Sequence, residues 1–200
     1  MMGDMQDKSL QHEKLHDKEI ELKFNLPDPG KSIQALREKA VFKAQEHQKD
    51  LYYTPSYRNF LAEKHVSEWL RIRESDAGDS ICYKDYHKKE AGAKTVHCDE
   101  FETRIDDAAA LKKIFSAIGI RQIAIVNKKR SIFNFKQAEI AIDIVDELGA
   151  FLEIEAKGDF GSVDEAKAYL HATMSELGIQ VGEQDFVGYP YLLLKKRGLV

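Results

Sequence analysis

Glu19-Ile20-Glu21-Leu22-Lys23-Phe24 alternates charged and apolar residues without a break. A period of two is typical of a β-strand whose two faces differ. One face of this strand carries Glu19, Glu21 and Lys23, and the other face is entirely apolar. The stretch therefore predicts a strand with one charged face and one apolar face.

The same alternation returns at 70–73, 100–104, 126–130, 140–144 and 152–155. Two arrangements fit such strands. A sheet could pack its apolar face on helices and turn its charges to bulk water, or it could curl so that the charged faces line a cavity. The pattern alone leaves both open, because enclosed charges are costly unless they pair or bind an ionic ligand.

The remaining elements follow from periodicity and turn residues. A helix is expected over 31–48, where apolar residues recur at helical spacing, a second after Asp106 or Asp107, and a third from the capping box at Ser162 to Gly178. The expected strands cover 18–26, 50–53, 69–73, 80–86, 95–105, 121–130, 132–136, 138–145 and 150–157. Hairpin connections between them predict an antiparallel α+β fold. About eight strands is the size at which a barrel closes around one small ligand, which favours a closed or nearly closed barrel with flanking helices.

Length and composition favour one globular domain over 18–200, preceded by a frayed or disordered tail over 1–17. The net charge of −4 does not suggest a nucleic-acid partner, and no apolar run is long enough to span a membrane. The absence of a signal-peptide pattern, with Cys82 and Cys98 expected as free thiols, predicts a cytoplasmic protein.

The charged faces contain several basic and several acidic residues. Their basic members are Lys23, Arg71, Arg73, Lys84, Lys128 and Arg130, and their acidic members are Glu19, Glu21, Glu100, Glu102, Asp143, Glu153 and Glu155. Arginine and lysine suit phosphate oxygens. Carboxylates two residues apart on a strand lie about 7 Å apart and can share Mg²⁺ or Mn²⁺. A metal-bound polyphosphate is the ligand that needs both sets.

Glu19-x-Glu21-x-Lys23 resembles the signature of the CYTH superfamily, the triphosphate tunnel enzymes. Further motifs follow in that family's order: Arg58-Asn59-Phe60, Trp69-Leu70-Arg71-Ile72-Arg73, Tyr83-Lys84, Val126-x-Lys128-x-Arg130, Ile142-Asp143 and Leu148-Gly149-x-Phe151-Leu152-Glu153-Ile154-Glu155. The likeness covers about 18–196 and is strongest to the class IV adenylyl cyclases. It implies a triphosphate tunnel built from the eight-stranded barrel.

The resemblance also implies residue roles. Glu19, Glu21, Asp143 and Glu153 are expected to be catalytic as ligands of the divalent metal. The residues expected to grip the triphosphate are Lys23, Arg71, Arg73, Lys84, Lys128 and Arg130, with Glu100, Glu102 and Glu155 as a second tier. Two departures from the cyclase pattern are Asp85-Tyr86 after Lys84 and Cys98 before the Glu-x-Glu pair.

Three functions fit this pattern. The leading hypothesis is an adenylyl cyclase that converts ATP to cyclic AMP and pyrophosphate with Mg²⁺ or Mn²⁺. The alternatives are a triphosphatase acting on inorganic, nucleoside or thiamine triphosphate, and a binder of nucleotide or polyphosphate without turnover. The expected partner is ATP or another triphosphate, not nucleic acid or a membrane, and a homodimer is left open.

Overall fold

The computed structural model describes residues 20–62, 66–87 and 97–200, apart from the side chains of residues 87, 97 and 98. Within these ranges eight strands pair in the order β1-β8-β7-β6-β2-β3-β4-β5. The predicted α+β class with eight antiparallel strands is confirmed. The described residues form two compact units, one within 1–44, 131–142 and 150–185 and the other within 45–130, 143–149 and 186–200.

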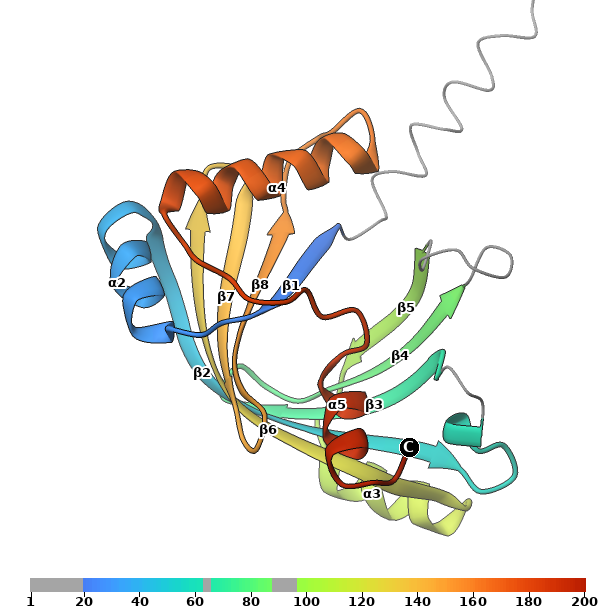
Figure 1. Cartoon of the computed structure of the whole chain (residues 1–200). Helices are drawn as coiled ribbons and strands as arrows, with labels where there is room; N and C mark the ends of the chain where they lie inside the picture. The colour runs from blue at the N-terminus through green and yellow to red at the C-terminus, as the bar shows by residue number, and fades with distance from the viewer. Residues whose placement is uncertain (1–19, 63–65, 88–96) are drawn as a thin grey trace, which may run out of the picture. The chain divides into compact units, whose positions relative to one another are not determined.

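The first unit contains β1 (Glu21–Asn25), α2 (Pro29–Lys39), most of β7 (Ala138–Val145), nearly all of β8 (Gly149–Ala156) and α4 (Val163–Leu177). β1 pairs with β8 so that Glu21 faces Glu155 and Lys23 faces Glu153. The apolar face of this sheet packs on α2 and α4, and Figure 1 shows α4 running across β7 and β8. Its core includes Leu22, Leu36, Ile140, Leu152, Ile154 and Leu170.

The second unit contains β3 (Glu68–Ser75), β4 (Ser80–His87), β5 (His97–Arg104), α3 (Ala108–Ala117) and α5 (Tyr189–Lys196). A short 3₁₀ helix, η1 (Phe60–Ala62), precedes β3. α3 packs on the apolar face of the sheet, where Phe115 meets Leu51, Tyr53 and Ile72. Two long strands, β2 (Val41–Pro55) and β6 (Ile120–Phe135), contribute residues to both units.

Three expected elements differ from the structure. The helix expected over 31–48 ends at Lys39, and β2 begins at Val41 because Ala40 already has an extended backbone. The strands expected over 121–130 and 132–136 are one continuous strand, β6. The apolar tail forms a fourth described helix, α5. The strand expected over 50–53 is longer in the structure, since β2 starts at Val41. The remaining strands and helices lie within a few residues of their expected positions.

The tail expected over 1–17 lies outside the described residues, as does Glu19. The single domain expected over 18–200 stays a prediction. Among the described residues, no helix combines the length and the apolar character that crossing a membrane requires.

Candidate functional site

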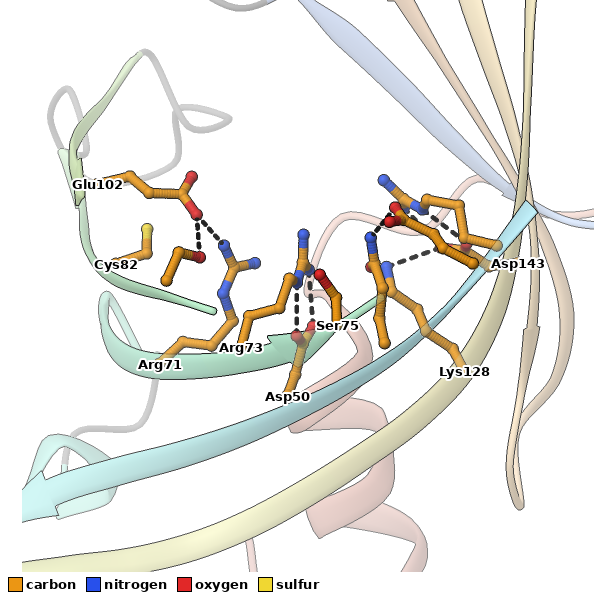
Figure 2. Close-up of polar contacts among 12 residues, drawn as sticks. Asp50, Arg71, Arg73, Ser75, Cys82, Glu102, Lys128 and Asp143 are labelled. Atoms are coloured by element: carbon orange, nitrogen blue, oxygen red, sulfur yellow. Dashed lines mark hydrogen bonds and ion pairs between the residues drawn. The ribbon is translucent and has the colours of Figure 1, made fainter. Parts of the chain in front are cut away.

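The second unit gathers basic side chains on the charged face of its sheet. Strand register explains the grouping, since Asp50 lies opposite Arg73, Arg71 opposite Cys82, and Lys84 opposite Glu100. Cross-strand neighbours point to the same face. Figure 2 shows Asp50, Arg71 and Arg73 on one side of β2 and β3.

Each of these cations on β3 and β4 contacts a carboxylate. Arg73 donates two hydrogen bonds to Asp50, at 2.7 and 2.8 Å. Arg71 lies 3.4 Å from Glu102, whose carboxylate also accepts a 2.6 Å hydrogen bond from the Ser80 hydroxyl. Lys84 Nζ lies 2.6 Å from Glu100. The contacts fix the direction of the basic groups, which preorganises them for an anionic ligand.

Asp143 is the centre of a second group on the same unit. Its carboxylate is fully buried and accepts hydrogen bonds from Arg130 at 2.6 and 2.7 Å and from Lys128 Nζ at 3.0 Å. The Tyr189 hydroxyl at the start of α5 donates a further hydrogen bond to it at 2.9 Å. Lys128 Nζ also lies 5.1 Å from the centre of the Tyr189 ring, within cation–π range.

Burial and charge together set the ionisation of this face. Burial opposes the charged form of Asp50, yet its bonds to Arg73 hold the pKa of the carboxyl below the ordinary value. Burial likewise opposes the charge on Arg71, but attraction to Asp50 raises the pKa of the guanidinium. The pKa of Lys84 is raised too, because Tyr86 and Glu100 outweigh the effect of burial. The basic groups are therefore charged at neutral pH.

Cys82 lies among these ions as a buried thiol. Burial raises its pKa to about 12, and nearby Glu100 adds to the shift. The thiol therefore stays protonated at neutral pH and donates to Glu100 at 3.2 Å.

The first unit carries a smaller charged group around β1 and β8. Lys23 Nζ lies 3.5 Å from Glu153 and 3.6 Å from Asp185. Glu155 faces Glu21 across the strands and forms a 2.6 Å ion pair with Lys157. Asp185 is held there because backbone hydrogen bonds join residues 182, 183 and 185 to the edge of β1. This group has more carboxylates than cations.

Comparison with known proteins matches residues 17–189 to the CYTH domain family. The chain belongs to the CYTH family. A protein of Methanocaldococcus jannaschii named "Putative adenylate cyclase" is 28% identical over 179 residues, which is 88% of this chain and 98% of the relative. The PH1819 protein of Pyrococcus horikoshii OT3 has a similar structure, with a TM-score of 0.70 and 26% identity, over 90% of this chain and 99% of that one.

HpAC1 from Hippeastrum shares the fold, with a TM-score of 0.61 and 19% identity, over 91% of this CYTH chain and 97% of its own. It is named a "Putative adenylyl cyclase" and described as having a dominant triphosphatase activity. At this identity the likeness concerns the fold.

The carboxylates of this CYTH chain differ in how well they suit a divalent metal. Glu21, Glu153, Glu155 and Asp185 offer the oxygen ligands that Mg²⁺ and Mn²⁺ prefer, although Lys23 contacts Glu153 and Asp185 and Lys157 contacts Glu155. Cys82, Glu100 and Glu102 can bring their ligand atoms within 4.8 Å of one another, but Arg71 and Lys84 lie beside them. Both oxygens of Asp143 already accept hydrogen bonds. Each of these groups therefore has basic neighbours with which a bound metal ion would compete.

The structure groups the predicted site residues by unit. The second unit brings together Arg71, Arg73, Lys84, Lys128, Arg130, Asp143, Glu100 and Glu102. The first unit brings together Glu21, Lys23, Glu153 and Glu155. Sequence reasoning missed Asp50, Tyr189 and Asp185. Only Asp50 carried a usable signal, because Asp50 and Tyr52 alternate with Leu51 and Tyr53.

Proposed function

We propose that this CYTH protein is a metal-dependent enzyme of triphosphates, and that it cyclises ATP to cyclic AMP and pyrophosphate. One observation carries the proposal. Five basic side chains of β3, β4 and β6 gather in the second unit, each held by a carboxylate, namely Arg71, Arg73, Lys84, Lys128 and Arg130. A polyanion is the ligand for which such a preorganised set of cations is suited. The M. jannaschii relative named as a putative cyclase supports the choice of reaction.

The basic residues would carry out the binding part of the reaction. Each arginine guanidinium can donate hydrogen bonds to two phosphate oxygens at once, whereas Lys84 and Lys128 each offer a single ammonium group. In the cyclase reaction the ribose 3′-oxygen bonds to the α-phosphorus as the bond from that phosphorus to the bridging oxygen breaks. Pyrophosphate leaves with the negative charge that these cations stabilise, and the hydroxyl proton passes to solvent.

We also propose that Glu19, Glu21 and Glu153 hold Mg²⁺ or Mn²⁺, as the family resemblance implies. A bound divalent ion would favour ionisation of the attacking hydroxyl and neutralise phosphate charge. Glu155 and Asp185 adjoin this group in the first unit. Glu21→Ala should therefore abolish turnover while the fold remains.

A triphosphatase is the second candidate, in which water attacks the γ-phosphorus and ADP and phosphate are the products. The activity described for HpAC1 favours it, as do Asp85-Tyr86 and Cys98, which depart from the cyclase pattern. The same cations would bind the triphosphate in either reaction, so the products must separate the two.

Product analysis tests the proposal. The protein is incubated with ATP and either Mg²⁺ or Mn²⁺, and the products are separated by ion-exchange chromatography. Cyclic AMP with equimolar pyrophosphate is the expected result. ADP and phosphate alone would reject the cyclase in favour of the triphosphatase, and binding of ATP without any product would reject both enzymes.

Lys128 and Lys129 provide a matched pair of variants. Lys128 is buried against Asp143, whereas Lys129 is exposed on the same strand. Loss of a hydrogen bond from a charged group costs about 1.5–3 kcal/mol, so Lys128→Ala should lower kcat/KM by about ten- to a hundredfold. Lys129→Ala should retain the wild-type value. Equal activity in both variants, with circular dichroism unchanged, would contradict the site.

A further inference from the structure

Asp50 is an almost fully buried carboxylate among the basic residues of the second unit. Its side chain is 1% exposed, and the strand register places it directly opposite Arg73 of β3. A carboxylate buried to this extent is costly to the fold unless charged groups accompany it. The groups that accompany Asp50 are residues that we expect to bind the triphosphate. Its role therefore concerns the site as well as the fold.

Three cations act on Asp50. Burial opposes the charged form of the carboxyl, but attraction to Arg73, and also to Arg71 and Lys128, holds its pKa below the ordinary value. These cations come from β3 and β6, the strands on either side of β2 in the sheet. One anion in their midst reduces the repulsion between them when no ligand is bound. Asp50 thus serves the basic group as a whole.

The contact with Arg73 fixes one edge of the guanidinium. Nε donates to Oδ1 of Asp50 at 2.7 Å, and Nη2 donates to Oδ2 at 2.8 Å. Two such bonds hold the planar group in one orientation. Both N–H groups of Nη1 and the second N–H of Nη2 remain, and no other described residue accepts a hydrogen bond from Arg73. Figure 2 shows the guanidinium reaching past Asp50, away from β2.

A ligand can reach Arg73 without reaching Asp50. The Arg73 side chain is 18% exposed, whereas that of Asp50 is 1% exposed. The pair of Arg71 and Glu102 differs, because this carboxylate is itself 41% exposed and lies 3.4 Å from its arginine. A phosphate group can therefore replace Glu102 beside Arg71, but it binds Arg73 in addition to Asp50. Arg73 keeps its orientation when the site is filled.

We propose that Asp50 is a positioning residue of the triphosphate site, which directs Arg73 toward the leaving group in the transition state. The inference rests on the proposed function. In the cyclase reaction and in the triphosphatase reaction, negative charge accumulates on the leaving group as its bond to phosphorus breaks. The remaining N–H groups of Arg73 donate to that charge. Asp50 acts through Arg73 and does not itself touch the substrate.

Asp50→Asn separates positioning from binding. The amide has the size of the carboxylate, but its Nδ2 group donates and cannot accept from the guanidinium, so Arg73 loses its fixed orientation. The change also removes a negative charge near Arg71 and Lys128, which favours binding of a polyanion. We therefore expect kcat for ATP to fall about tenfold or more, while KM does not rise.

Glu74 provides a matched control on the opposite face of the same strands. It follows Arg73 in β3, lies opposite Lys49 of β2 and pairs with Lys112 of α3. Glu74→Gln removes a carboxylate from these ion pairs and leaves the charged face unaltered. Its kcat and KM should equal those of the wild type. Each variant is assayed at a temperature at which circular dichroism shows it to be folded.

Nuclear magnetic resonance of the full chain labelled with ¹⁵N-arginine tests the positioning without turnover. The Arg73 Nε–H signal is identified by its absence from Arg73→Lys. Its exchange with solvent should be slow in the wild type and should stay slow when tripolyphosphate is added without metal, because Asp50 remains its acceptor. In Asp50→Asn the exchange should be at least about tenfold faster.

Several outcomes would overturn the inference. They are a wild-type kcat in Asp50→Asn, a raised KM with kcat unchanged, an equal loss of kcat in Glu74→Gln, and fast exchange of the Arg73 Nε–H once tripolyphosphate is bound. A wild type that binds tripolyphosphate but turns over no ATP would instead contradict the proposed function, and the exchange measurement would then decide whether Asp50 holds Arg73 for a polyanion. Failure to bind tripolyphosphate would overturn both.

Discussion

Two arginines of β3 illustrate how burial decides the strength of an ion pair. Arg73 pairs with Asp50, whose side chain is 1% exposed, whereas Arg71 pairs with Glu102, whose side chain is 41% exposed. Both contacts join an arginine to a carboxylate on a neighbouring part of the same sheet. Removing a partner from a buried pair leaves an uncompensated charge, while solvent screens the exposed pair.

Asp50→Ala should accordingly destabilise the protein by about 3 kcal/mol, and Glu102→Ala by less than about 1 kcal/mol. Urea denaturation at neutral pH measures both. The lowered pKa of Asp50 adds a pH dependence, because its contribution is present above the unfolded pKa of about 3.9 and is lost as the pH falls through the folded value. Equal losses in the two variants would contradict the role of burial.

Sequence alternation predicted which side chains share a face but not which of them touch. Lys128, Arg130 and Asp143 were expected on charged faces, and the structure brings them into contact. The Tyr189 hydroxyl that completes this group comes from a helix more than forty residues away, at a separation of 46. No local pattern encodes such a contact, because it depends on where α5 packs.

At the scale of elements, helix ends were predictable wherever capping chemistry was explicit. α4 begins after Ser162, whose hydroxyl accepts from the backbone N–H of Glu165 at 3.1 Å. It ends at Gly178, which has a φ of 73° in the left-handed region. α2 was less predictable. Val41 and Ala44 continue the helical spacing of Ile33 and Leu36, yet they lie in β2, where pairing with the sheet overrides the local pattern.

Ser162→Ala should destabilise the protein by about 1 kcal/mol, since it removes the acceptor for a backbone N–H of the first turn. Ser162→Asp keeps an acceptor at that position and should stay near the wild type. Thermal unfolding followed by circular dichroism provides the comparison. If the alanine and aspartate variants melt together, the cap contributes nothing measurable.

At the scale of the whole molecule, both units repeat one design, a sheet with an apolar face under helices and a charged face opposite. That division was readable from the sequence, because it depends only on alternation along each strand. The strand order could not be predicted from the sequence, since β1 pairs with β8, which lies more than a hundred residues later in the chain. Such pairings depend on long-range packing rather than on local pattern.

The buried thiol of Cys82 should make the folded protein less stable at alkaline pH. Its pKa is raised from 9.0 to about 12, so the folded state keeps a proton that the unfolded state releases. The contribution of the protonated thiol to the free energy of unfolding is present below about pH 9 and is lost as the pH rises toward 12. Cys82→Ala should flatten this decline in the free energy of unfolding, measured by urea titration across that range. If the variant lost stability with pH as steeply as the wild type, the raised pKa of Cys82 would be contradicted.

β6 also constrains how this gene can change in length. Lys128 belongs to the charged face of the second unit, and Phe133, five residues later on the same strand, belongs to the apolar core of the first. Deleting one codon between them would invert every later side chain of the strand and exchange core for charge. Evolution along this strand is therefore expected to proceed by substitution, while insertions and deletions collect in the loops.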